Sequence, residues 1–303
     1  MKRPYFPGDF KRMARAALSR NLPAAAMVYF LAALPGLLSS AFASAQSLPL
    51  NELLGNYMTK LYTGEAFSTD MLMADLRALR STMLVAAWVL QLAASLLTPA
   101  LTLGAIAALL TLLRGGEISY GDVFCRVGCF LKGILLAVMV ALKTALWMLP
   151  GIAVSAVAIV LITLTDSVGL AMGLSMLGSA LMLALGLRAV MHYAMAEFAL
   201  ADNPSLGVMG AIRESVSLMR YRKLQLAMLY VSFIGWVFLS NLVCSMFLRA
   251  GVVYYVVNIV LSLAINIYML TSQCAFYHVY SGHPSQRQET VLLEMPSPDG
   301  PMQ

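Results

Sequence analysis

The sequence predicts an all-α membrane protein, a polytopic transmembrane helical bundle of about six spans with short cytoplasmic interfacial amphipathic helices. Hydrophobic residues make up 60% of the 303 residues and charged residues only 11%, whereas about 25% of a soluble domain is charged. Long apolar stretches recur along the chain, and about 20 helical residues are enough to cross a hydrocarbon core. Lysine and arginine gather between alternate stretches, which is typical of cytoplasmic loops.

Six apolar segments supply the expected spans, at residues 22–45, 81–113, 131–165, 167–200, 225–248 and 252–280. Three of them are longer than the bilayer is thick, and tilt, kinking or projection beyond the bilayer can absorb the excess. Pro99 and Pro150 are the expected kink points because proline removes an intrahelical hydrogen bond. The residues leave open whether segments 81–113 and 131–165 are single kinked spans or broken helices.

The distribution of positive charge predicts the orientation. Fourteen of the twenty Lys and Arg residues fall on one side, namely Lys2, Arg3, Lys11, Arg12, Arg15, Arg20, Arg114, Arg126, Lys132, Arg213, Arg220, Arg222, Lys223 and Arg287. Positive residues near membrane ends stay in the cytoplasm, so both termini are predicted to be cytoplasmic. The opposite side has Lys60, Arg77, Arg80 and Arg249, and its main loop is predicted at residues 46–80.

The chain divides into a basic amphipathic N-terminus at 1–21, a membrane domain at 22–280 and a disordered cytoplasmic tail at 281–303, where Pro, Ser and Gln are frequent. Residues 203–219 predict an interfacial helix that opens with Pro204. Its expected apolar stripe consists of Leu206, Met209, Ile212, Val216 and Met219. Shorter amphipathic stretches precede the first and third spans, so three hairpin units starting near residues 5, 119 and 204 are one interpretation, and chance likeness between apolar helices is the other.

The net charge of +6 points to anionic lipid headgroups, because the positive residues lie beside apolar spans and form no basic face for nucleic acid. The candidate headgroup-binding residues are Arg12, Arg15, Arg220, Arg222 and Lys223. The four cysteines have neither a disulfide framework nor the usual zinc spacing. We therefore expect reduced thiols, no metal and no cofactor.

Polar residues inside the spans allow two interpretations each. Lys143 lies near the expected bilayer middle and could mark a functional pathway, or it could snorkel or lie beside Asn258 or Asn266. These asparagines could line a cavity or simply bond neighbouring helices.

The end of the fourth span has Arg188, His192 and Glu197. They could form a proton relay, since histidine titrates near neutrality, but anchoring at the interface is the favoured interpretation.

Motifs for an enzyme are missing from the sequence. No H-E-x-x-H, phosphate-binding glycine loop or nucleotide motif occurs. Ser175 and His278 superficially resemble a serine protease pair, but the expected topology puts them near opposite membrane surfaces. We therefore predict no catalytic residues.

Residues 193–236 contain four ordered motifs, at 201–204 (ADNP), 215–219 (SVSLM), 222–223 (RK) and 232–236 (SFIGW). Their order resembles the signature region of the bacterial membrane proteins grouped as domain of unknown function family 975. Residues 99–104, 122–124 with Lys132, and 275–277 extend the similarity, whereas Tyr221 stands where glycine is expected. The resemblance implies a six-helix bacterial inner-membrane protein and transfers no catalytic residue.

The motif residues also predict local structure. Asp202 and Asn203 are expected to cap the interfacial helix, and Gly235 is expected to permit close packing. Gly169 and Gly173, four residues apart, predict a close helix contact.

Together these observations favour a non-enzymatic, multi-pass protein of the bacterial cytoplasmic membrane. It would act as an envelope scaffold or accessory factor that binds anionic lipid or protein partners in the membrane. The alternative is a transporter or channel-like protein with a polar cavity at the midplane, using Lys143, Asn258 and Asn266.

The orientation can be tested with reporter fusions. A reporter at Lys60 is expected outside the cytoplasm and one at Ser215 inside it, because Lys and Arg are concentrated on the side that has Ser215. Paired alkaline phosphatase and fluorescent-protein fusions measure this. Location of the two positions in one compartment contradicts the topology.

Overall fold

The computed structural model describes residues 5–63, 69–165, 168–247 and 252–281. Its helices are α1 (Pro7–Leu18), α2 (Leu22–Thr63), α3 (Thr69–Leu113), α4 (Phe130–Thr165), α5 (Val168–Tyr193), α6 (Ala196–Asp202), α7 (Gly207–Met219), α8 (Lys223–Met246) and α9 (Val252–Ser281), with the 3-10 turns η1 (Tyr120–Phe124), η2 (Val127–Cys129) and η3 (Pro204–Leu206). No strand occurs in the described ranges. The predicted all-α fold is confirmed.

Six helical segments in these residues are long and apolar enough to cross a membrane. They are Leu22–Ser40, Val89–Leu113, Phe130–Ala158, Met172–Asp202, Lys223–Met246 and Val253–Ser281. The expectation of about six spans is therefore confirmed. Residues 1–4 of the expected N-terminal segment and 282–303 of the expected tail lie outside the described residues.

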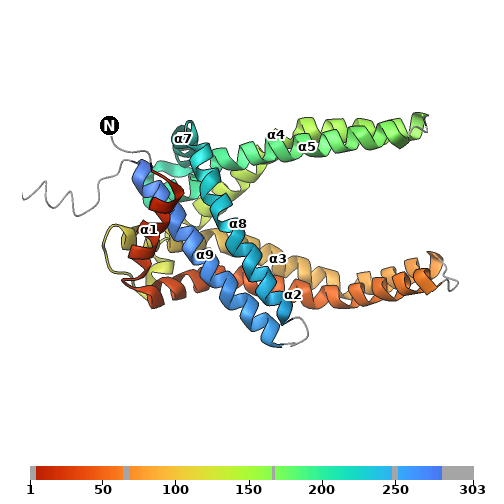
Figure 1. Cartoon of the computed structure of the whole chain (residues 1–303), viewed down its shortest axis with the longest axis horizontal. Helices are drawn as coiled ribbons and strands as arrows, with labels where there is room; N and C mark the ends of the chain where they lie inside the picture. The colour runs from red at the N-terminus through yellow and green to blue at the C-terminus, as the bar shows by residue number, and fades with distance from the viewer. Residues whose placement is uncertain (1–4, 64–68, 166–167, 248–251, 282–303) are drawn as a thin grey trace, which may run out of the picture.

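Three helical hairpins, α2–α3, α4–α5 and α8–α9, spread from a common end of the molecule (Figure 1). We call this end the base. It consists of α1, α6, α7 and η1 together with the parts of α2, α3 and α9 that pack against them. A short helical segment precedes each hairpin in the sequence, and the internal repeat stays a prediction.

The hydrophobic core lies in the base and is centred on the C-terminal part of α3. All eight residues from Leu103 to Leu110 are buried, and eight consecutive positions cover every face of a helix. A helix that is apolar on all sides needs partners on all sides, and α3 contacts α1, α2, α4, α6, α9 and η1. This part of α3 is the axis around which the base assembles.

Helix α1 packs against α9 and α8 through its buried face. Pro7 occupies the first turn, and the Asp9 carboxylate accepts a hydrogen bond from the Phe6 amide at 3.0 Å, which pairs an otherwise open donor at the helix start. The buried Phe10 ring lies 5.2 Å from that of Phe276. Lys11 Nζ donates to the Ser232 carbonyl at 2.9 Å, and partial burial lowers the pKa of Lys11.

The first hairpin is longer than expected. We predicted a loop at residues 46–80, but α2 continues to Thr63 and α3 begins at Thr69. The physical reason is the high content of helix-forming Leu, Met, Ala, Glu and Lys in residues 51–63 and 69–80. The two helices also pair, since the Tyr57 hydroxyl donates to Asp75 Oδ2 at 2.9 Å. The α2–α3 hairpin thus extends well past its membrane-spanning part.

Both prolines expected to kink a span lie inside continuous helices. Pro99 is inside α3 and Pro150 is inside α4. Segments 81–113 and 131–165 therefore belong to one unbroken helix each, which answers the question that the sequence left open.

The fourth apolar segment is divided into α5 and α6, although we expected one span at 167–200. The break falls at residues 194–195, where the Ser215 hydroxyl of α7 donates to the His192 carbonyl at 2.9 Å and accepts from the Met195 amide at 3.2 Å. Buried backbone groups must be paired. One side chain from α7 therefore supplies the bonds that the break would leave unmade.

Close backbone packing occurs at glycines other than those predicted. A Cβ at Gly104 would collide with the Val123 carbonyl in η1, and one at Gly151 would lie 2.9 Å from the Gly178 carbonyl oxygen across the α4–α5 contact. A Cβ at Gly169, Gly173 or Gly235 would meet no atom within 4 Å. The predicted close contacts at these three glycines are wrong, because all three face away from neighbouring helices.

Gly104→Ala is expected to lower the free energy of unfolding by about 1–3 kcal/mol, since the methyl group must displace the η1 backbone. Gly173→Ala is the matched control and is expected to be neutral or stabilising by up to about 1 kcal/mol, because alanine favours a helix more than glycine does. Thermal unfolding in one detergent measures both. Equal melting temperatures for the two variants would rule out the Gly104 contact.

Candidate functional site

The elbow between α6 and α7 is positioned by three long-range or capping contacts. Asn203 Oδ1 accepts from the Ser205 amide at 3.2 Å, as expected of a cap. Asp202, for which we also expected a capping role, forms an ion pair with Arg114. Lys132 Nζ donates to the Pro204 carbonyl at 2.9 Å, which ties the start of α4 to the same turn.

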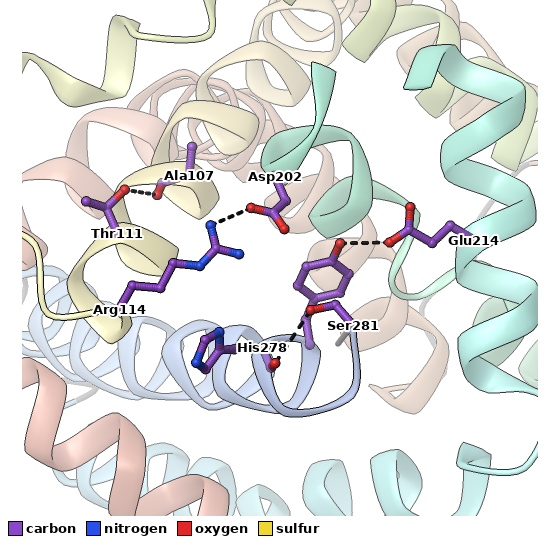
Figure 2. A network of polar contacts seen from close by, with 8 residues as sticks. Ala107, Thr111, Arg114, Asp202, Glu214, His278 and Ser281 are labelled. Carbon is purple, nitrogen blue, oxygen red and sulfur yellow. Dashed lines mark hydrogen bonds and ion pairs between the residues drawn. The ribbon is translucent and has the colours of Figure 1, made fainter. Parts of the chain in front are cut away.

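A buried polar network joins this elbow to α3 and α9. Figure 2 shows Arg114 reaching from α3 to Asp202, and the Arg114 Nη1 to Asp202 Oδ1 distance is 2.6 Å. The two side chains are only 18% and 8% exposed. On the other side of the elbow, the Tyr277 hydroxyl of α9 donates to Glu214 Oε1 of α7 at 3.0 Å. The network fixes how α3, α6, α7 and α9 meet.

A basic pocket of about 690 Å³ lies beside the elbow, between α4, α5, α7 and the start of α8. Its charged side chains come from four helices, and they are Lys143, Arg188, Arg213, Arg220 and Lys223, joined by His192. Tyr193, Ile212, Val216 and Ser217 complete the lining. No Asp or Glu lines the pocket, and none of its five cations has a carboxylate partner within the described residues.

Aromatic and histidine contacts hold two of these groups in place. The Arg188 guanidinium lies 5.7 Å from the centre of the Trp147 ring, and His192 stacks on the same ring at 5.8 Å. His192 Nδ1 lies 2.8 Å from the Arg188 carbonyl, and Nε2 lies 2.7 Å from Lys223 Nζ. A neutral imidazole that donates from Nδ1 and accepts at Nε2 satisfies both contacts. His192 therefore orients Lys223 within the pocket.

The predicted headgroup residues are distributed over several places. Arg220 and Lys223 line the basic pocket, whereas the Arg222 guanidinium lies 4.1 Å from the centre of the Tyr280 ring. Arg12 is 84% exposed and 3.7 Å from Asp9. Arg15 lines a separate, largely apolar groove of about 580 Å³ between α1, α8 and α9.

The intramembrane candidates are also separated. Lys143 lines the basic pocket, which no α9 residue lines. Asn258 accepts from the Ser262 hydroxyl at 3.0 Å, and Asn266 donates to the Ser262 carbonyl at 2.8 Å, so both bond along their own helix. Arg213 also lines the basic pocket, although its sequence neighbours contain no signal of a binding site and only its positive charge predicted a cytoplasmic position.

In the described part of the chain, no three His, Cys, Asp or Glu residues lie close enough together to hold a metal ion. The described cysteines are all reduced. Burial raises the pKa of the Cys125 thiol, which makes this cysteine a weaker nucleophile at neutral pH.

The family of the chain follows from comparison with protein-family models. The model described as "Protein of unknown function (DUF975)" matches residues 8–282. The chain belongs to this family. No match is found among curated proteins or solved structures. Several residues that carry the resemblance meet in the base, since Gly104 packs on Val123 and Lys132 bonds to Pro204.

Asp202→Asn is expected to lower the free energy of unfolding by about 3–5 kcal/mol, because it leaves the Arg114 charge buried without a partner. Arg12→Gln removes an exposed ion pair and is expected to change the free energy of unfolding by less than about 1 kcal/mol. Chemical denaturation in detergent measures both.

The double variant Arg114→Met/Asp202→Leu tests the cause, because an apolar pair of similar volume leaves no charge unpaired and should recover most of the loss. An Asp202→Asn protein as stable as Arg12→Gln would contradict a structural role for the pair.

Proposed function

We propose that the protein is a non-enzymatic, multi-pass protein of the bacterial cytoplasmic membrane that binds anionic lipid headgroups and acts as an envelope scaffold or accessory factor. The observation that carries the proposal is the basic pocket, with five cations from four helices and no carboxylate in its lining. Like charges held this close repel one another. An anion in the pocket relieves that repulsion.

The surroundings of the pocket favour a lipid over a free anion. Leu146, Leu187 and Leu224 each lie within one helical turn of a pocket cation, and they are 65%, 59% and 71% exposed. Exposed leucines on spanning helices contact acyl chains, while basic pockets between such helices suit phosphate-bearing headgroups. The site therefore offers an apolar surface and a cationic one within the length of a single lipid.

The predicted orientation agrees with this ligand. With both termini in the cytoplasm, the elbow and its pocket face the inner leaflet, where anionic lipids give the membrane surface a negative potential. The groove that Arg15 lines has the same combination of one cation and an apolar wall, so it is a second candidate for lipid.

A scaffold role draws support from the first hairpin. Helices α2 and α3 continue beyond their spans Leu22–Ser40 and Val89–Leu113. In the predicted orientation, this helical extension lies on the outer side of the membrane and offers a surface to protein partners.

Arg220→Gln/Lys223→Gln is expected to weaken binding of an anionic phospholipid by about 25-fold, since each headgroup contact with a basic residue is worth about 1 kcal/mol. Arg222→Gln is the matched control and should leave the affinity unchanged, because Arg222 packs on Tyr280 outside the pocket. Titration of the full chain in detergent with fluorescent phosphatidylglycerol measures the affinities.

Phosphatidylcholine provides the ligand control and should bind both variants alike. Equal phosphatidylglycerol affinities for the double variant and the unmodified chain would overturn the proposal. An equal loss in Arg222→Gln would move the site away from the pocket.

A further inference from the structure

A second cavity, of about 380 Å³, lies between α2, α3 and α6. Most of its lining residues are polar, although all of them belong to the candidate membrane spans. Ser39 and Ser40 come from α2, while Gln91, Ser95, Thr98 and Thr102 come from α3. Its one ionisable lining residue is Glu197 of α6.

Glu197 stands out within its helix. Ala196, Phe198, Ala199, Leu200 and Ala201 are all buried, whereas the Glu197 side chain is exposed and lines the cavity. Glu197 therefore faces the cavity while the remainder of α6 packs in the core.

Each of the five hydroxyl groups around the cavity donates its proton in a hydrogen bond within the protein. Ser40 donates to the Leu37 carbonyl, Ser95 to Leu92, Thr98 to Ala94 and Thr102 to Thr98, at 2.6–2.9 Å. Ser39 donates to Gln91 Oε1. A hydroxyl has one proton and two acceptor lone pairs. These five side chains can therefore offer a ligand only acceptor oxygens.

Pro99 adds a further acceptor oxygen to the surroundings of the cavity. It lies inside α3 and lines the cavity. Because proline has no N–H, the carbonyl oxygen four residues earlier, at Ser95, receives no amide donor from position 99. Among the lining side chains, only the Gln91 amide keeps N–H donors.

The charge of the cavity is not balanced by the protein. Glu197 forms no ion pair within the described residues, and no Lys, Arg or His lines the cavity. An ionised carboxylate within a membrane-spanning segment is costly unless a cation lies beside it. The described part of the chain supplies no such cation, so an external cation can take that place.

We propose that this cavity binds a small monovalent cation, either an alkali metal ion or the ammonium group of a protonated amine. One carboxylate together with neutral hydroxyl and carbonyl oxygens matches a single positive charge, whereas Ca²⁺ sites usually combine several charged oxygens. The volume exceeds that of a bare ion and lies at the lower end of small-molecule pockets. It accommodates a hydrated ion or a small amine.

The test uses the full chain in nanodiscs of zwitterionic lipid, titrated at neutral pH with radiolabelled sodium, rubidium or methylammonium. At least one probe should bind saturably, and the arm that binds identifies an alkali ion or an amine. Glu197→Gln should weaken this binding by at least about 30-fold, because it removes the only charge that faces the ion. Glu117→Gln, at an exposed position outside the cavity, should leave the affinity unchanged.

A second variant tests the site in case Glu197→Gln fails to fold. Thr98→Val keeps the side-chain shape, removes one acceptor and should weaken binding by about fivefold. Binding of phosphatidylglycerol to Glu197→Gln should stay normal, since Glu197 lies outside the basic pocket, and this separates the cation site from the lipid site. If that lipid binding is lost, the Thr98→Val result decides.

Three results would overturn the cation site. One is a lack of saturable binding of all three probes to the unmodified chain, which would mean that a proton alone neutralises Glu197. Another is an unchanged affinity in a folded Glu197→Gln protein. The third is an unchanged affinity in Thr98→Val where Glu197→Gln fails to fold.

Discussion

The buried ion pair between Arg114 and Asp202 is the constraint on which the arrangement of the base depends. Arg114 follows the most buried part of α3, and Asp202 ends α6. A charge in this position cannot be left unpaired without a large loss of stability, so α6 has to dock on α3 in one register. Asn203 and Pro204 follow at once and set the direction of α7. Glu214 of α7 then meets Tyr277 of α9.

The break between α5 and α6 separates two sites of opposite charge. Arg188 and His192, before the break, line the basic pocket, and Glu197, after it, lines the acidic cavity. The Ser215 hydroxyl bonds to backbone groups on both sides of this break. The structure therefore does not gather in one cavity the three residues considered for a proton relay or for anchoring at the interface.

Much of the fold was predictable because hydropathy and helix propensity are local properties. The apolar segments predicted six spans, and Pro204 predicted the turn from which η3 and then α7 begin. The residues of the expected stripe of that helix lie in two environments, since Ile212 and Met219 are buried whereas Met209 is 45% exposed. The buried face of α7 is set by the positions of α4, α5 and α6, which residue spacing alone does not specify.

The sequence by itself determined that this chain is a six-span helical membrane protein of its family, with positive charge concentrated near particular helix ends. Only the tertiary structure decided which of those charges lie together. Lys143 and Arg213 are far apart in the chain, yet they line one pocket. Arg222, by contrast, packs on the Tyr280 ring, although its chain neighbours Arg220 and Lys223 line that pocket. The physical reason is that hydrophobicity accumulates along a segment, whereas a binding site depends on how distant segments pack.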